Sequence, residues 1–198
     1  MMYDMTADHS IDIVYNLSHL HNRNISQLST ITMSSLLTFL GLTAPEGLDL
    51  PNRAIPYLLF NWFYAYGILS TRPAKRLLRI DHNVAPRDDL KVYGEAAVQA
   101  GKISRRQLDR LKRQEAAHAN AVEGFPLFVA AVVVALRTGL PNDVINGIGA
   151  WYTISRILFG LAYVFIESET LSFSRSVLWW SGNISCITAL VLGGRKLN

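Results

Sequence analysis

The sequence has little charge and almost no cysteine. Only 17% of its 198 residues are Asp, Glu, Lys or Arg, whereas an ordinary soluble domain has about 25%. The single cysteine, Cys186, excludes an internal disulfide bond and a metal site made of cysteines. The five histidines are too scattered to indicate another metal site, and the sequence has no Gly-rich phosphate loop and no hydrolase triad. These absences exclude several common classes of enzyme.

The apolar residues, by contrast, are abundant and lie in long runs. Ala54 to Thr71 and Ser176 to Gly194 carry no charged side chain, and Val144 to Ile166 carries only Arg156. Each run is close to the roughly 20 residues that cross a bilayer as a helix. A fourth uncharged run extends from Gly124 to Leu136. The pattern predicts an all-α integral membrane protein, a four-helix bundle.

The first 50 residues differ in composition from the rest. They are rich in Ser, Thr, Asn and His, and their longest apolar piece, Leu36 to Leu40, is too short to cross a membrane. A cleaved signal peptide would have a basic segment followed by a sustained apolar core. These residues contain no such pattern, so we do not expect a signal peptide here. We therefore predict a mostly disordered tail over residues 1–50 and a four-span membrane domain over residues 51–198.

Positive charge is concentrated in the connection between the first two predicted spans. Residues 72–113 hold 12 of the 19 Lys and Arg residues, against five Asp and Glu residues. Because such connections stay on the cytosolic side, we expect this one to be cytosolic. Pro73, Pro86 and two glycines indicate that it is largely loop. It lacks interleaved aromatic residues, so a membrane surface is a better expected neighbour than nucleic acid.

Polar residues precede the uncharged run of the second span. Ser104 and Gln107 form a capping-box pattern that predicts a helix from there to about Arg137. On this helix, Asn120 and Glu123 are three residues apart and therefore share a face. A carboxylate within a membrane span is costly and usually has a function.

The third span carries one polar stripe. Tyr152, Arg156, Phe159 and Tyr163 follow one another at intervals of four, three and four residues, which places them on one side of a helix. Arg156 needs a counter-charge or a polar cavity, and Glu123 is the obvious partner. The stripe therefore forms either an Arg156–Glu123 ion pair or, with Asn120 and Glu123, a polar cleft.

The last span begins with Arg175 and Ser176. An arginine gains nothing from the dipole at a helix N-terminus, which favours an anion. The helix end and Arg175 together would suit a thiolate or a carboxylate. The alternative is that Arg175 anchors the helix by reaching the lipid headgroups.

Three pieces of the sequence resemble the family of membrane-associated proteins in eicosanoid and glutathione metabolism, MAPEG. The most specific is Asn120-Ala-Val-Glu123-Gly-Phe-Pro126, the family's N-x-x-E-x-x-P pattern. The second is Arg156 followed seven residues later by Tyr163, and the third is Arg175-Ser176 followed by Trp179. The resemblance covers about residues 52–194 and implies a homotrimer, in the endoplasmic reticulum membrane, with glutathione between neighbouring subunits.

The resemblance also implies roles for individual residues. Asn120 and Glu123 would hold the peptide part of glutathione, Tyr163 would contact it, and Arg175 would be the catalytic residue that stabilises the thiolate. The remaining candidates for the glutathione site are His118, Arg113, Arg156 and Ser176.

Two positions depart from the family pattern. Ala116 stands where many catalytic members have arginine, and Arg113, one turn earlier, is the candidate to replace it. Phe159 stands where members often have Tyr or His. Because of these departures we do not expect a substrate of the mammalian eicosanoid type. They indicate a family member outside the animal eicosanoid-forming enzymes.

Three functions fit these features. The first is a glutathione-dependent transferase or peroxidase that acts on lipophilic electrophiles in the bilayer. The second is a non-catalytic member that binds lipid or serves as a scaffold, which the residues at 116 and 159 favour. The third is a proton or ion conduit through Glu123 and Arg156. Binding of glutathione distinguishes the first from the other two.

Overall fold

The computed structural model of the chain describes residues 29–197, which fall into two compact units divided between Pro51 and Asn52. In the first unit, residues 29–39 form a helix, and the backbone then turns at Leu40 and Gly41. This helix lies in the segment that we expected to be mostly disordered. Residues 1–28 of that expectation lie outside the described residues.

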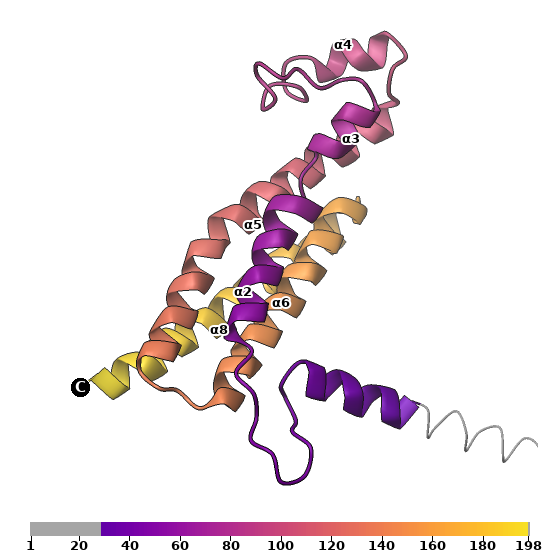
Figure 1. Ribbon diagram of the computed structural model, residues 1–198. Helices are drawn as coiled ribbons and strands as arrows, with labels where there is room; N and C mark the ends of the chain where they lie inside the picture. Colours follow the sequence, from indigo (N-terminus) through magenta and orange to yellow (C-terminus); the bar gives the residue numbers. More distant parts are fainter. Residues whose placement is uncertain (1–28, 198) are drawn as a thin grey trace, which may run out of the picture. The chain divides into compact units, whose positions relative to one another are not determined.

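Helices make up the second unit (Figure 1), and no β-strand occurs in residues 29–197. A helix, α2, continues directly into a π-helix, η1, and two short helices, α3 and α4, precede the long helix α5. After α6, a single turn, α7, leads to α8. The bounds are α2 Ala54–Phe63, η1 Tyr64–Ile68, α3 Arg72–Leu77, α4 Gly94–Gln99, α5 Arg105–Arg137, α6 Asn142–Phe165, α7 Glu169–Ser172 and α8 Ser174–Leu197.

Three stretches of the described chain are long and apolar enough to cross a membrane, namely Arg105–Arg137, Asn142–Phe165 and Glu169–Leu197. They agree with three of the four predicted spans. The first predicted span forms α2 and η1, which have 10 and 5 residues. At about 1.5 Å per residue this is shorter than the roughly 30 Å hydrocarbon core of a bilayer. Over residues 29–197 the fold is thus all-helical, with three helices that could cross a membrane by length and composition, whereas four were predicted.

Helix α5 begins and ends where its sequence predicts. Ser104 and Gln107 form the reciprocal capping box, because each side chain accepts a hydrogen bond from the other residue's backbone N–H. At the other end, Gly139 has a positive φ of 61° and its carbonyl accepts a hydrogen bond from Lys196 Nζ at 2.7 Å. The helix runs 33 residues without interruption through Pro126.

Polar side chains fasten α2 and η1 to the bundle. The buried Asn61 donates a 2.7 Å hydrogen bond to Thr153 Oγ1 on α6. Gly160 lies against the Tyr64 hydroxyl so closely that a methyl group there would overlap it. Because interhelical hydrogen bonds and small residues are what hold helices together in lipid, these contacts define how α2 packs.

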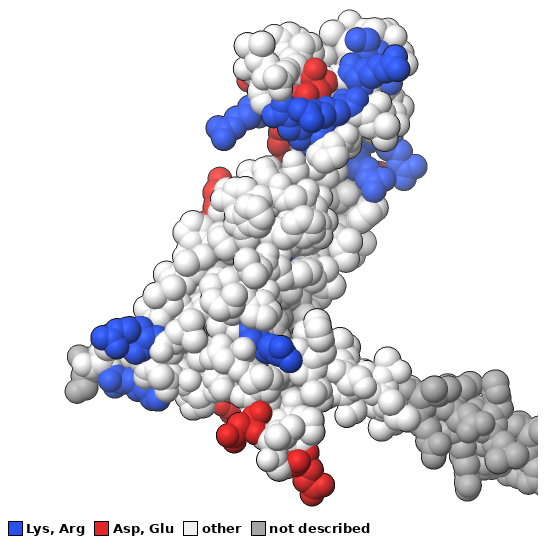
Figure 2. Space-filling model, in the orientation of Figure 1, with Lys and Arg blue, Asp and Glu red and all other residues white. Residues whose placement is uncertain are grey.

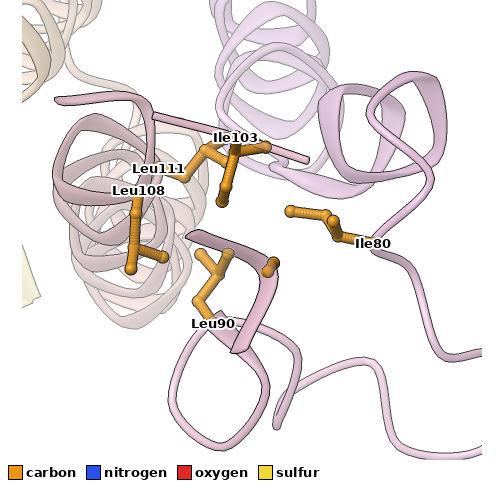
Figure 3. Close-up of a cluster of buried hydrophobic side chains, with 6 residues drawn as sticks. Ile80, Leu90, Ile103, Leu108 and Leu111 are labelled. Carbon is orange, nitrogen blue, oxygen red and sulfur yellow. The ribbon is translucent and has the colours of Figure 1, made fainter. Parts of the chain in front are cut away.

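Between η1 and α5, residues 72–103 form a small folded cap. Ile80, Leu90, Ala97 and Ile103 of the cap form one hydrophobic cluster with Leu108 and Leu111 of α5 (Figure 3). The ammonium group of Lys75 lies 2.9 Å from the carboxylate of Asp89, and their side chains are 4% and 0% exposed. The segment that we predicted to be largely loop therefore has a core of its own.

Candidate functional site

A cavity of about 280 Å³ lies between α5, α6 and α8, near the C-terminus of α6. It brings together four of the eight predicted site residues, because α5 contributes Asn120, α6 contributes Tyr163, and α8 contributes Arg175 and Ser176. All three sequence pieces that resemble MAPEG thus meet at one place. The full lining is Asn120, Phe159, Tyr163, Ser172, Arg175, Ser176, Trp179 and Trp180.

Several polar atoms in the cavity are available to a ligand. Asn120 donates a 3.0 Å hydrogen bond to Ala116 O, one turn back on its own helix, so its Oδ1 remains an acceptor. The hydroxyl groups of Tyr163 and Ser176 form no hydrogen bond with another residue of the described chain. A ligand with both donors and acceptors could therefore be bound here.

Arg175 supplies the positive charge of the cavity and is held in place by the end of α6. Its Nη2 donates to Ile166 O at 2.7 Å, and its Nε donates to Ala162 O at 3.4 Å. The guanidinium also lies over the Tyr163 ring, 4.4 Å from the ring centroid. The last carbonyls of a helix are without intrahelical partners and favour a cation. The contacts therefore orient Arg175 while leaving Nη1 for a ligand.

The Arg156–Glu123 ion pair, one of the two alternatives for the stripe, is not formed. Arg156 is 2% exposed, and its Nη2 donates a hydrogen bond to Asn183 Oδ1 on α8. Glu123 is exposed and forms no ion pair with any described residue. The reason is the rotation of α5, since the backbone of Gly124 lies against the Arg156 guanidinium. Glu123, one residue earlier, is turned by about 100° around the helix axis and points away.

The predicted stripe on α6 is confirmed as the inward side of that helix. Tyr152, Arg156 and Phe159 are buried, and Tyr163 is half-buried. The Arg156 guanidinium lies 4.9 Å from the centroid of the Tyr152 ring and 5.9 Å from that of Phe159. Nε and Nη1 of Arg156 are buried without a hydrogen-bond partner in the described chain. Arg156 is thus one turn deeper than the cavity, behind Phe159.

Two further candidates have partners elsewhere in the fold. His118 Nδ1 lies 2.7 Å from Ala65 O, and because a carbonyl oxygen only accepts, Nδ1 donates. This bond satisfies a carbonyl of the π-helix η1, so His118 lies toward α2 rather than in the cavity. Arg113 donates from Nη2 to Glu167 at 2.8 Å and from Nε to Val164 O at 3.3 Å. Neither residue lines the cavity.

Asn183 and Trp180 are the neighbours of the site that the sequence reasoning missed. Asn183 is 5% exposed within an uncharged run. A buried amide in a span needs a partner, and its position two turns after Arg175 is the signal that could have found it. Trp180 follows the expected aromatic Trp179, and the two rings pack edge to face at 5.0 Å.

A double-mutant cycle is expected to show which residue is coupled to Arg156. Arg156→Ala, Asn183→Ala and the double variant should give a coupling free energy of about 1–2 kcal/mol, because a charged group donates the hydrogen bond inside the bundle. The same cycle with Glu123→Ala should give a coupling near zero. Unfolding of the detergent-solubilised protein measures both, and an equal coupling in the two cycles would contradict the assignment.

The fold and the cavity together define a helical integral membrane protein with a polar site between its spanning helices. Comparison with protein families matches residues 57–195 to the MAPEG family, which is most of the chain. The chain therefore belongs to the MAPEG family, whose members are membrane proteins of eicosanoid and glutathione metabolism. Searches of curated proteins and of solved structures gave no match.

Proposed function

We propose that the protein is a membrane-embedded, glutathione-dependent transferase or peroxidase that acts on lipophilic electrophiles. The supporting observation is the cavity in which Asn120, Tyr163, Arg175 and Ser176 meet. In this proposal Asn120 binds the peptide part of glutathione, Tyr163 and Ser176 donate hydrogen bonds to it, and Arg175 lies beside its sulfur. Glutathione supplies a thiol, which is a nucleophile only as the thiolate.

The charges around the cavity suit that ligand. Arg175 is the cation that lines it, and a cation beside a thiol favours the ionised form. Arg156, one turn deeper, has two buried nitrogens without a partner in residues 29–197, and it is the candidate for an anionic group that enters further. The volume, about 280 Å³, is just below the range of about 300–1,000 Å³ that is usual for ligand pockets.

We further propose that the protein is a homotrimer and that a neighbouring subunit completes the site. Glu123 is exposed on a span, where a carboxylate in contact with lipid is costly. On the same helix Ala119 and Ala130 are also exposed, and small residues allow close packing of helices. A second copy of α5 against this side would cover Glu123 and place its carboxylate beside bound glutathione.

The topology in this proposal has four spans, with α2 and η1 as the first. Ile55, Leu59, Trp62 and Phe63 of α2 are exposed apolar side chains, as expected in lipid. A short span is accommodated by local thinning of the bilayer. The cap, rich in Lys and Arg, would then face the cytosol, and we assign the endoplasmic reticulum as the membrane.

A second candidate function is lipid binding without catalysis. An apolar groove of about 860 Å³ lies between α6 and α8, and its lining includes Trp151, Phe173, Val177, Trp180 and Ile184. Such a groove would suit an acyl chain. Trp180 belongs to both the groove and the polar cavity, so the same groove could also deliver a lipophilic substrate. The conduit function has no support, because Glu123 and Arg156 do not face each other.

Titration with glutathione tests the leading proposal. Protein in nanodiscs is expected to bind glutathione and to show the ultraviolet difference absorbance of a thiolate. Asn120→Ala should weaken the affinity about three- to tenfold, because one hydrogen bond is lost. The matched control is Asn52→Ala, since Asn52 pairs with Asn142 at the other end of the bundle.

Two results decide between the candidates. If wild-type protein shows neither binding nor thiolate absorbance, the enzyme proposal fails and the lipid-binding function replaces it. If Asn52→Ala weakens binding as much as Asn120→Ala, the cavity is not the site.

A further inference from the structure

The cap presents positive charges that the rest of the chain does not neutralise. Arg79, Arg87, Lys91 and Lys102 are exposed, and none forms an ion pair with another described residue. Figure 2 shows Lys and Arg atoms gathered over this end of the molecule, whereas the surface of the bundle between its two ends is largely uncharged. Among the acids of the cap, Asp88 is exposed and forms no ion pair with a described residue.

Four other cations of the cap and of the start of α5 are already paired with acids, and Arg110 of α5 lies over the Phe165 ring. Arg72 and Arg76 lie 3.8 and 3.4 Å from Asp81. Arg105 and Lys112 lie 2.6 and 3.4 Å from Glu95. The hydrogen bonds from Arg105 and then Lys112 lower the pKa of Glu95 to about 2, so Glu95 remains charged at neutral pH. The unneutralised charge is therefore confined to a few positions.

Two aliphatic side chains of the cap are almost fully exposed. Leu77, the last residue of α3, is 85% exposed, and Val84, in the following loop, is 100% exposed. In Figure 1 this loop extends to the side of α5 rather than along it. The cap has its own hydrophobic cluster, so these two residues are not needed for its core.

Arg79 occupies a position that favours glycine. It follows the end of α3 with φ of 56°, and it is the one non-glycine residue of the described chain with a positive φ. The backbone N–H groups of Arg79 and Ile80 bond to Arg76 O and Lys75 O, as in a helix C-cap. An arginine there is strained relative to glycine, yet its side chain makes no ion pair with a described residue.

We propose that the cap docks on an anionic bilayer surface, with Arg79, Arg87, Lys91 and Lys102 on the lipid headgroups and Leu77 and Val84 inserted between them. We call these six residues the docking surface. The cap is tethered at the bilayer, because only residues 69–71 separate η1 from α3. The cytoplasmic leaflet carries the negative lipids that attract basic segments next to spans.

An anionic lipid fits the docking surface better than a nucleic acid. Lipid offers an apolar layer below its phosphates, which accepts Leu77 and Val84. Single-stranded nucleic acids are bound by aromatic side chains on which bases stack. Tyr93 is the one aromatic residue among the exposed large apolar residues of the cap. Its ring already packs on His82, with 4.2 Å between the ring centroids.

A spin label on the full-length chain tests this proposal. Cys186 is the single cysteine and is buried, so Cys186→Ala with Val84→Cys gives one labelling site at the tip. The protein is placed in nanodiscs of phosphatidylcholine alone or of phosphatidylcholine and phosphatidylserine in a four-to-one ratio. We expect the label to enter the apolar layer only in the nanodiscs that contain phosphatidylserine. In that layer the label is accessible to oxygen but not to a water-soluble nickel chelate. A label at Gln99, on α4, should remain in water in both.

Charge variants measure the contribution of the cations. Each cation near the surface strengthens docking about fivefold, so Arg87→Ser with Lys91→Ser and Lys102→Ser should weaken it about 100-fold. High salt should also weaken docking, because it screens the attraction between the cations and the lipid headgroups. Hydrogen exchange of residues 77–92 in the chain that keeps Cys186 gives a second readout of docking.

Arg79→Gly separates docking from folding. Glycine relieves the positive φ at this position, so the cap should become more resistant to unfolding while docking weakens about fivefold. Loss of docking together with loss of cap stability would instead show that the effect is structural and would overturn the assignment of Arg79.

Three results would overturn the proposal itself. The label stays in water with phosphatidylserine, it enters the bilayer equally without phosphatidylserine, or a polyuridine RNA protects the cap while anionic lipid does not. The last result would identify the docking surface as a site for nucleic acid.

Discussion

Asp89→Ala is expected to unfold the cap while the membrane helices remain intact. The substitution leaves the ammonium group of Lys75 without a counter-charge, with Pro86 O as its remaining acceptor, in a site where the Lys75 side chain is 4% exposed. Removing one partner of a buried ion pair typically lowers stability by about 3–5 kcal/mol, because the other charge remains buried. The cap has only one small cluster of apolar residues to oppose this loss.

Hydrogen exchange of the detergent-solubilised protein measures the effect by segment. Amides of residues 80–103 should lose protection, whereas those of α6 should not. The control is Glu95→Gln, which also removes an acid from an ion pair with a basic residue, but at the exposed surface, where such pairs contribute little. Lys75→Met combined with Asp89→Leu should restore part of the protection. Equal losses for Asp89→Ala and Glu95→Gln would show that burial of the pair is unimportant.

The same ion pair gives the cap a defined dependence on pH. Burial raises the pKa of Asp89, but hydrogen bonds from Lys75 and His82 outweigh this and hold the pKa below its usual value of 3.8. A carboxyl whose pKa is lowered on folding stabilises the fold fully above its unfolded pKa. The contribution is lost as the pH falls through the lower, folded pKa. The cap should therefore begin to weaken below about pH 4 and the Asp89→Asn variant should lack this step.

Much of the membrane domain could be predicted from the sequence because three of its signals are local. An uncharged run near 20 residues in lipid must satisfy its own backbone hydrogen bonds, which makes it a helix. The capping box at Ser104 and Gln107 defines where α5 begins, whatever the helix packs against. The stripe on α6 is equally local, since the spacing of Tyr152, Arg156 and Phe159 alone places them on one side.

The cap and the partner of Arg156 depend on tertiary structure. Ile80, Leu90 and Ile103 have no regular spacing, so nothing in the sequence shows that they meet. Both Glu123 and Asn183 were suitable partners for Arg156, and only the rotation of α5 and α8 about their axes selects Asn183. The family pattern added Arg175 to Asn120 and Tyr163, which spacing had already predicted to share a cleft, and the three residues line one cavity.

Arg175→Ala is expected to abolish most turnover with a lipophilic electrophile while much of the affinity for glutathione remains. A neighbouring cation lowers the pKa of an acidic group by about 1–3 units, and each unit corresponds to about 1.4 kcal/mol. Loss of Arg175 should therefore reduce the thiolate fraction at neutral pH, and with it the turnover, about 10- to 1,000-fold. In the proposed site, Asn120 and Tyr163 still line the cavity and would bind the peptide.

A structural explanation must be separated from this electrostatic one, because Arg175 also bonds to Ala162 O and Ile166 O at the end of α6. Arg175→Lys keeps the charge but not the planar group with its two bonds, so it should retain most of the thiolate absorbance even if the melting temperature falls. Arg195→Ala removes the same charge from the same helix, about 30 Å away by its rise per residue, and should change neither. If Arg175→Ala keeps full thiolate absorbance and loses turnover only in proportion to its stability, then Arg175 positions α6 and another group activates the thiol.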